Sequence, residues 1–400
     1  MSLNNVVSAE RVHIGFFGMR NAGKSSLVNA VTGQSLSLVS DVLGTTTDPV
    51  KKAMELLPLG PVVIIDTPGL DDVGILGEQR VARAKQMLSI TDIAILVIDA
   101  TKGISQSDNE LLVLFKEKNL PHIIAYNKAD LLENIPPAQN NEIYVSAEKN
   151  INTNELKEKI ASLAKATENT KTLLGDLVAY GDTVVLVTPI DESAPKGRLI
   201  LPQQHTIREL LEIGATIVVC RETELKNTLE KLKELPKLVI TDSQVFGYVS
   251  KIVPQSVMLT SFSILFARYK GDLATVVAGA SHLDKLNNGD KILISEGCTH
   301  HRQCKDIGTV KMPDWVRNYS KKELEFHFTS GTEFPEDTSE YALVIHCGGC
   351  MLNEKEMKSR IERSIKNGTP ITNYGIAIAQ MHNILKRSVE PFPEILKLLK

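Results

Sequence analysis

The chain has 400 residues, a formal net charge of −3 and 42% hydrophobic residues, and its sequence pI is about 6.3. This length allows two or three domains with ordinary cores, and the near-neutral charge excludes a global basic field for nucleic acid. No apolar run approaches the roughly 20 residues that span a bilayer, so we expect neither a membrane nor nucleic acid as partner. Residues 1–11 lack the pattern of a signal peptide, and five cysteines argue against a disulfide framework, so we expect a cytoplasmic protein.

A phosphate-binding loop stands near the start of the chain. Val12 to Phe17 predicts a buried strand and Ser26 to Thr32 predicts a helix. Between them, Gly18-Met19-Arg20-Asn21-Ala22-Gly23-Lys24-Ser25 matches GxxxxGK[ST], whose backbone N–H groups surround phosphates. Lys24 would reach the β- and γ-phosphates, and the Ser25 hydroxyl would bind Mg²⁺. We expect nucleotide contacts from Gly18, Asn21, Ala22, Gly23, Lys24, Ser25 and Ser26.

A second nucleotide motif follows a predicted strand at Val62 to Ile65. Asp66-Thr67-Pro68-Gly69 matches DxxG, in which Asp66 holds the Mg²⁺ shell and the Gly69 N–H senses the γ-phosphate. Leu70 stands where Ras-type proteins place a water-orienting Gln, so unaided hydrolysis is expected to be slow. Another buried strand is predicted from Ile93 to Ile98.

The guanine motifs complete the set. Asn127-Lys128-Ala129-Asp130 follows the predicted strand His122 to Tyr126 and matches NKxD, and Asp130 can accept two hydrogen bonds that guanine offers and adenine does not. Ser146-Ala147 follows the predicted strand Glu142 to Val145 and fits the loop that contacts the guanine oxygen through its backbone. Four motifs in this order predict a domain that binds GTP and GDP.

The segment Gly44-Thr45-Thr46-Thr47-Asp48 resembles the switch of GTPases of the Era and tRNA-modification class. We expect Thr46 to bind Mg²⁺, with Thr45 as the neighbouring alternative. Asn21 stands where potassium-activated members of this class carry an Asn, whose amide oxygen can ligate K⁺ beside the phosphates; the alternative is a turn-forming Asn. The residues expected to carry hydrolysis are Lys24, Thr46, Asp66 and Gly69.

A small parallel α/β unit follows the nucleotide domain, which we expect to span residues 1–168. No phosphate or metal pattern occurs in the unit, so residues 173–256 are expected to form an assembly or dimerisation domain. Cys220 ends an apolar strand and is expected to be buried and inert. The predicted strands are 183–187, 216–220 and 238–241, and the predicted helices are 202–212 and 222–235.

The C-terminal segment, residues 257–400, carries metal-ligating residues after two predicted strands. Cys298-Thr299-His300 follows the strand Lys291 to Ser295, and His346-Cys347-Gly348-Gly349-Cys350 follows the strand Tyr341 to Ile345. If these strands are neighbours, the three cysteines converge. Gly348 and Gly349 allow a tight turn whose N–H groups point at sulfur. Helices are predicted at Val257 to Tyr269 and Glu354 to Ile365.

The residues alone leave the metal open. Three cysteines and two histidines suit a closed Cys₃His zinc site, or a [4Fe–4S] cluster on Cys298, Cys347 and Cys350 with one iron held by a labile ligand. A metal-free redox CxxC is a third possibility. Candidates for the fourth ligand are His346, His300, Glu296 or a non-protein group.

The order of motifs and domains resembles HydF, the GTPase family of [FeFe]-hydrogenase maturation. That family ends in CxH, a spacer and HCxxC, and here 45 residues separate His300 from His346. The resemblance implies an α/β fold in three domains: a potassium-activated P-loop GTPase, a dimerisation domain and a domain for a [4Fe–4S] cluster. The implied ligands are Cys298, Cys347 and Cys350, with an exchangeable fourth position.

The resemblance further implies a scaffold and carrier that acts as a homodimer. It would receive a two-iron unit bearing CO, CN⁻ and a dithiolate, assembled with two radical-SAM maturases, and pass it to apo-[FeFe]-hydrogenase. The competing hypothesis is a ribosome- or tRNA-linked GTPase with a zinc-bound accessory domain, against which the acidic pI speaks. A third is an iron–sulfur redox sensor whose nucleotide state reports the cluster.

Overall fold

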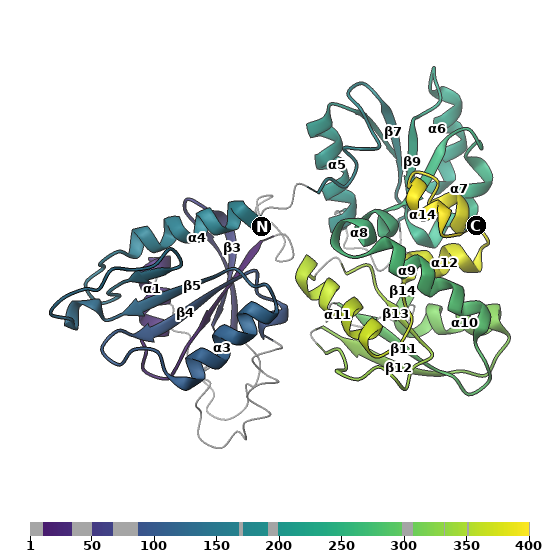
Figure 1. Cartoon of the computed structure of the whole chain (residues 1–400). Coiled ribbons are helices and arrows are strands. Elements are labelled where there is room, and N and C mark those ends of the chain that lie inside the picture. The colour runs from purple at the N-terminus through teal and green to yellow at the C-terminus, as the bar shows by residue number, and fades with distance from the viewer. Residues whose placement is uncertain are drawn as a thin grey trace. The chain divides into compact units, whose positions relative to one another are not determined.

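The chain divides into two compact units, Met1–Asn169 and Thr170–Lys400 (Figure 1). None of the helices in the described residues has the length and apolar character needed to cross a bilayer. The structure is a computed structural model that describes residues 11–33, 50–66, 87–167, 171–190, 199–297, 307–331, 333–349 and 352–399.

A six-stranded sheet of order β2-β3-β1-β4-β5-β6 forms the centre of the first unit. All neighbouring strands are parallel except β2, which runs antiparallel to β3 at the edge. Every residue of β4 is buried, which explains its continuous apolar sequence. The strands are β1 (Val12–Phe17), β2 (Val50–Leu56), β3 (Gly60–Asp66), β4 (Ile93–Asp99), β5 (His122–Asn127) and β6 (Glu142–Tyr144).

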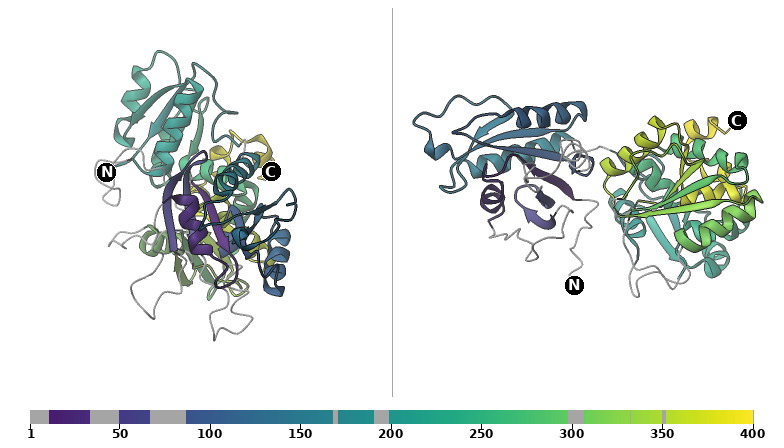
Figure 2. Two further views of the ribbon diagram at one scale, coloured as in Figure 1. Left: turned by 90° about the vertical axis from the view of Figure 1, so that its left-hand side faces the viewer. Right: turned by 90° about the horizontal axis from the view of Figure 1, so that it is seen from below.

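Helices cover both faces of this sheet (Figure 2). Apolar side chains of α1 (Lys24–Thr32) and α4 (Thr153–Thr167) pack on one face, and those of α3 (Gln106–Glu117) pack on the other. Because β1, β3 and β5 run parallel in this sheet, their carboxyl ends lie along the same edge, and each of these strands leads into a nucleotide motif. A short 3₁₀ helix, η2 (Ala129–Leu131), continues from the NKxD motif.

The second unit holds two parallel four-stranded sheets, of order β10-β9-β7-β8 and β12-β11-β13-β14. One hydrophobic core, with members from Leu173 to Phe392, joins the two sheets. The strands are β7 (Thr183–Val187), β8 (Thr216–Cys220), β9 (Leu238–Thr241), β10 (Met258–Ser261), β11 (Lys291–Glu296), β12 (Glu325–Ser330), β13 (Leu343–His346) and β14 (Ile371–Asn373).

Alternation along the strands gives the second of these sheets two buried faces. Leu293 and Val344 belong to the shared core on the face that α11 covers, while Ile294 and Ile345 face a separate cluster with α10 and α12. The helices of the unit are α5 (Leu201–Ile213), α6 (Leu225–Lys231), α7 (Phe246–Ile252), α8 (Phe262–Lys270), α9 (Leu273–Ala280), α10 (Met312–Ser320), α11 (Glu354–Lys366), α12 (Tyr374–Met381), α13 (Leu385–Ser388) and α14 (Pro393–Lys397). The short turns are η3 (Glu222–Glu224), η4 (Ser243–Val245), η5 (Ser281–Lys285) and η6 (Ile307–Lys311).

Two predicted helices of this unit were wrong in part. The helix predicted from Val257 to Tyr269 is strand β10 followed by α8, because Met258–Ser261 pairs with β9 and the Ser261 hydroxyl then caps the new helix by accepting from Ile264 N. β10 lies beyond residue 256, the limit expected for the middle domain, yet it is a strand of the middle sheet. The helix predicted from Glu222 to Leu235 begins as η3 and ends with α6 at Lys231, where Leu232 turns extended.

Candidate nucleotide site and candidate metal centre

The loop between β1 and α1 requires glycine at two positions. Gly18 has φ +138°, and a Cβ there would lie 2.2 Å from the carbonyl oxygen of Val97. Gly23 has φ +87°, and a Cβ there would lie 2.2 Å from Nδ2 of Asn127. The backbone can therefore wrap closely only without side chains at these positions, which is the geometry of a phosphate-binding loop.

Lys24 opens α1 and folds back over this loop. Its side chain is 9% exposed, and Nζ donates to the carbonyl oxygens of Gly18 at 2.7 Å and Met19 at 3.2 Å. These neutral acceptors hold the ammonium where the motif places the phosphates, so a nucleotide can replace them with stronger charged partners. Asn21, at φ +63°, and Ser25 are exposed beside it.

Asn127 connects the guanine motifs to the phosphate loop. Its Nδ2 donates to the carbonyl oxygens of Ala22 at 3.1 Å and Gly23 at 3.4 Å, and its Oδ1 accepts from Ala147 N at 3.0 Å. Ser146 is fully buried and exchanges two backbone hydrogen bonds with Ile151. The structure thus brings three of the predicted motifs into one hydrogen-bonded network, in which the loop predicted to contact guanine through its backbone donates its Ala147 N–H to Asn127.

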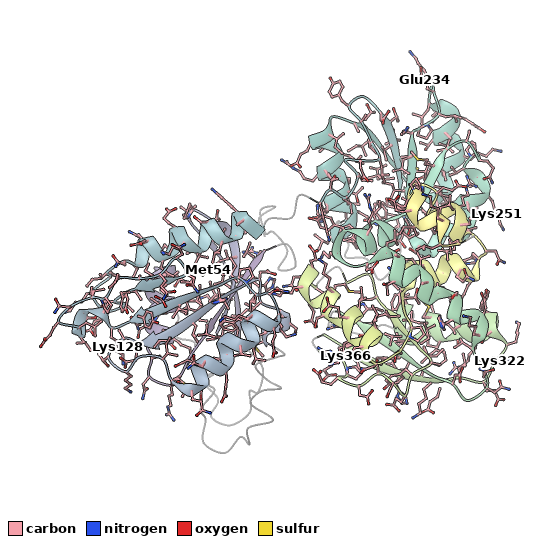
Figure 3. The ribbon with its side chains drawn as sticks, in the orientation of Figure 1. Met54, Lys128, Glu234, Lys251, Lys322 and Lys366 are labelled. Carbon is pink, nitrogen blue, oxygen red and sulfur yellow. The ribbon has the colours of Figure 1, made fainter. Side chains whose placement is uncertain are left out.

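The rest of the NKxD motif is also ordered by contacts. Lys128, labelled in Figure 3, has φ +66° and its Nζ donates to Asp99 at 2.5 Å. Burial raises the pKa of the Asp99 carboxyl, but hydrogen bonds from Lys128 and Thr101 outweigh it and hold that pKa below its usual range. Asp130 is half-buried in η2.

Parts of the expected nucleotide site lie outside the described residues. Thr46, its neighbour Thr45 and Gly69 belong to these parts. Asp66 ends β3, where its backbone pairs with β1 and β2, but its side chain is outside the description.

The two strands that precede the cysteine motifs are parallel neighbours. β11 pairs with β13, and Ser295 lies opposite His346. Beyond the strands, the Cys347 sulfur accepts from Gly297 N at 3.1 Å and from Gly349 N at 3.4 Å. Backbone N–H groups aimed at a sulfur favour its thiolate form, which is the form that binds soft metals and iron–sulfur clusters. Cys347 therefore fits a thiolate ligand.

The candidate centre includes other residues besides Cys347. Cys298, His300 and Cys350 lie outside the described residues, and within those described no three His, Cys, Asp or Glu side chains converge as for a metal. Glu296 is described: it is 5% exposed, and its Oε1 accepts from the Tyr374 hydroxyl at 3.2 Å, on the face covered by α12.

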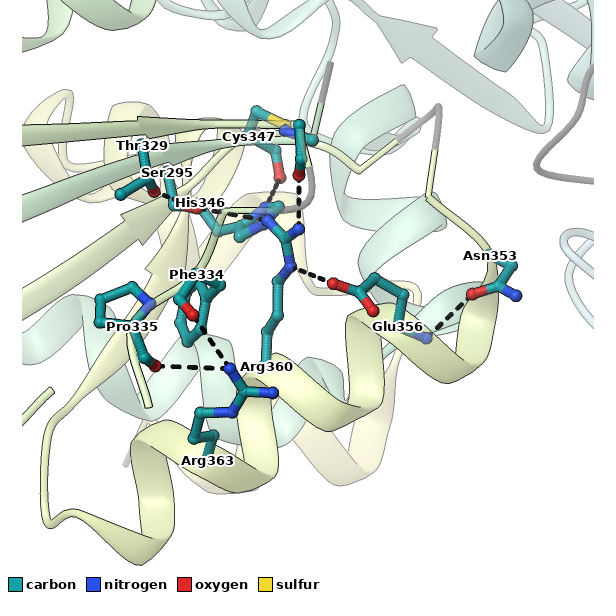
Figure 4. A network of polar contacts seen from close by, with 12 residues as sticks. Ser295, Thr329, Phe334, Pro335, His346, Cys347, Asn353, Glu356, Arg360 and Arg363 are labelled. Carbon is teal, nitrogen blue, oxygen red and sulfur yellow. Dashed lines mark hydrogen bonds and ion pairs between the residues drawn. The ribbon is translucent and has the colours of Figure 1, made fainter. Parts of the chain in front are cut away.

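His346 is fully buried at the end of β13 and is held at both ring nitrogens (Figure 4). Nδ1 lies 2.7 Å from the Cys347 carbonyl oxygen, and Nε2 lies 3.0 Å from Nη1 of Arg360. Burial and the Arg360 charge lower the pKa of His346 to about 3, against the opposing bond to Cys347, so the ring is neutral.

Sequence reasoning missed Arg360, because α11 is rich in charged residues. A signal was present, since Arg360 falls on the stripe formed by Met357, Ile361 and Ser364, at the spacing of one helix face. All four are buried.

Fold and loop geometry define this protein as a P-loop GTP-binding domain joined to an α/β unit with a cysteine-bearing loop. Residues 13–128 match the 50S ribosome-binding GTPase family, 173–271 the hydrogen maturase F dimerization domain and 274–391 the hydrogen maturase F tetramerization domain. The chain belongs to the hydrogen maturase F family, HydF. The resemblance found in the sequence, and the α/β fold in three domains that it implied, are thereby confirmed.

Curated relatives resemble part of the chain. GTPase Der of Kosmotoga olearia is 39% identical over 128 residues, which cover 31% of this chain and 29% of that protein. The tRNA modification GTPase MnmE of Francisella tularensis is 34% identical over 177 residues, covering 42% of this chain and 39% of that protein. The chain thus spans less than half the length of either. The solved structure of Aquifex aeolicus Era bound to GDP.AlF4- is 22% identical with a TM-score of 0.33, covering 52% of this chain and 93% of that structure.

Proposed function

We propose that this protein is a GTPase scaffold of hydrogenase maturation. It holds a [4Fe–4S] cluster and a two-iron unit with CO, CN⁻ and dithiolate ligands, and delivers the two-iron unit to apo-[FeFe]-hydrogenase. Two radical-SAM maturases assemble that cargo with it. The observation that carries the metal part is the pair of backbone N–H groups on the Cys347 sulfur, in a chain of the HydF family.

GTP is bound and hydrolysed by the first unit. Lys24 neutralises the β- and γ-phosphates, Ser25 and Thr46 hold Mg²⁺, and Asp66 orders the metal's shell. Gly69 senses the γ-phosphate, and Asp130 selects guanine. Support comes from the buried Lys24 ammonium over the loop and from the Asn127 network beneath it.

The metal domain uses Cys298, Cys347 and Cys350 as ligands. When bound, the cluster supplies an iron with an exchangeable position at which a cargo can attach and leave. Residues 1–168 serve nucleotide binding, the middle sheet including β10 serves dimerisation, and the segment that follows it serves cluster binding. The names of the two matched maturase domains support a homodimer and a larger assembly, which light scattering of the full chain tests.

Metal content is the decisive experiment. We expect anaerobically purified protein to hold about four irons and four sulfides per chain, as a [4Fe–4S] cluster requires. Cys347→Ser should lose the iron and keep GTP binding. Cys220→Ser is the matched control, because Cys220 ends β8 in the middle sheet. Stoichiometric iron in Cys347→Ser would show that the ligands are wrong, and one zinc without sulfide would favour the ribosome- or tRNA-linked alternative.

Potassium tests the nucleotide part of the proposal. With Leu70 after DxxG we expect hydrolysis to be slow, and the Asn21 amide oxygen would hold a K⁺ whose charge would offset the negative charge that develops on the phosphates. Replacing K⁺ by Na⁺ should slow GTP turnover about 10-fold, and Asn21→Ala should remove the difference between the ions. Asn119→Ala is the control, because Asn119 also has a positive φ of 46° but lies in another turn. Equal rates in both salts for the wild-type protein would remove Asn21 from this role.

A further inference from the structure

In the described C-terminal region, the Arg360 guanidinium is fully buried and makes four polar contacts. Its partners come from four segments (Figure 4). Nε donates to Glu356 at 2.9 Å, Nη2 to the Gly331 carbonyl at 2.6 Å, and Nη1 to the Ser295 hydroxyl at 3.3 Å. Nη1 also meets Nε2 of His346 at 3.0 Å, and the Phe334 ring lies 5.3 Å from the guanidinium carbon.

The direction of these bonds fixes the state of the His346 ring. A guanidinium only donates, so Nε2 of His346 must accept. The single ring proton is then on Nδ1, which donates to the Cys347 carbonyl at 2.7 Å. The chain of contacts runs from Glu356 through Arg360 and His346 to the backbone of Cys347.

In this arrangement His346 has no lone pair to offer a metal. Its Nε2 lone pair faces Arg360, and its Nδ1 carries the proton. Binding iron through either nitrogen would require breaking a fully buried contact, and would leave Arg360 or the Cys347 carbonyl without that partner.

A buried ion pair rarely adds net stability, because desolvation offsets the attraction of its charges. The Arg360 network must therefore be judged by what it positions. The network ends at Cys347, whose sulfur accepts the N–H groups of Gly297 and Gly349.

The geometry points to Arg360 as a positioning residue for the metal centre: through the neutral ring of His346 it fixes the backbone of Cys347 and keeps His346 from becoming a ligand. This inference rests on the proposed cluster site. Groups behind first ligands hold those ligands in orientation, and their loss costs about 10- to 100-fold in metal affinity.

The test compares full-length variants reconstituted anaerobically with iron and sulfide. Arg360→Leu/Glu356→Leu removes both members of the ion pair, so no buried charge is left alone. Arg363→Leu is the matched control, since Arg363 lies one turn further along α11 and donates to the Phe334 carbonyl at 3.0 Å and the Pro335 carbonyl at 3.5 Å instead of to His346 or Cys347. Thermal unfolding verifies that each variant is folded.

Two readouts decide. The rate of iron loss to a chelator should rise about 10- to 100-fold in the double variant and stay near the wild-type rate in Arg363→Leu. The EPR spectrum of the reduced cluster, which reports the geometry of its ligands, should change only in the double variant. A folded double variant with wild-type iron retention and spectrum overturns the inference.

Two further variants serve if the double variant fails to fold, and they also test the role of the His346 ring. Arg360→Lys keeps the charge but loses the planar fork, so iron loss should quicken less than in the double variant; a wild-type rate overturns the inference. His346→Gln should weaken iron retention as much as the double variant does, and joining the two should add little; full additivity overturns the relay through His346. Wild-type protein that takes up no iron overturns the cluster site itself.

Discussion

Two buried cations follow opposite designs in the two units of this protein. Lys24 donates to carbonyl oxygens of its own loop, at Gly18 and Met19. Arg360 is bonded from separate segments: a helix neighbour, two strands and a loop. Both stand close to where strands of a parallel sheet end.

The difference separates a charge that binds from a charge that positions. Lys24 donates to neutral carbonyl acceptors that a phosphate can replace, whereas Arg360 cannot move without breaking contacts to several elements. A buried cation is therefore informative about function only together with the origin of its partners.

Lys24→Ala has the largest expected effect. Loss of the ammonium over the phosphate loop should lower GTP turnover at least about 100-fold, because charge stabilisation of the transferred phosphoryl group is lost. Iron content should remain at the wild-type level, since the metal motifs lie in the other unit. Turnover and iron are measured on the same preparation, and loss of both would mean that the units do not fold independently.

Asn127→Ala should follow in size. It removes the side chain that donates to Ala22 and Gly23 and accepts from Ala147. We expect the free energy of GDP binding to weaken by about 2 kcal/mol, which calorimetry would detect as about 30-fold weaker affinity. Asn109→Ala, on the exposed face of α3, should bind GDP normally. Unchanged affinity in Asn127→Ala would separate the guanine motif from the phosphate loop.

The adjacent glycines of the cysteine loop should respond unequally. Gly349 has φ +62° and a Cβ there would lie 3.0 Å from the Met357 sulfur, whereas a Cβ at Gly348 would meet no atom of the described residues within 4 Å. Gly349→Ala should lower the free energy of unfolding by about 1 kcal/mol. Gly348→Ala should stay within about 0.5 kcal/mol of wild type. Denaturant unfolding measures both, and equal values would contradict the loop conformation.

Asp99→Asn should cost no more stability than Gly349→Ala, and its effect should depend on pH. Lys128 is 34% exposed, so solvent screens the pair and the expected loss of unfolding free energy is about 1 kcal/mol. Because the folded pKa of Asp99 is lowered, its contribution is present above the unfolded pKa of about 3.9 and is lost as pH falls through the folded value. The variant's deficit should thus be equal at pH 6 and pH 8 and shrink in acid. A deficit that grows in acid would contradict the assignment.

Local sequence patterns predict much of the fold but little of the buried polar network around Arg360. The strand β4 and the loop before α1 are written in consecutive residues, so the sequence alone predicts them. The sequence predicts helix at β10, because the apolar spacing of α8 extends back over it, whereas its pairing with β9 involves residues about 20 positions earlier in the chain. The contact of Arg360 with His346 depends on α11 crossing β13, which no local pattern states.

The shared interior of the second unit has a consequence for how its modules are counted. Family models divide this region between residues 271 and 274, yet one core runs from Leu173 to Phe392 across that division. Cutting the chain between these residues would expose apolar side chains of both pieces to water, so neither piece would have a complete hydrophobic core. We therefore expect the described residues of the second unit to unfold in one cooperative transition, although two family models divide them.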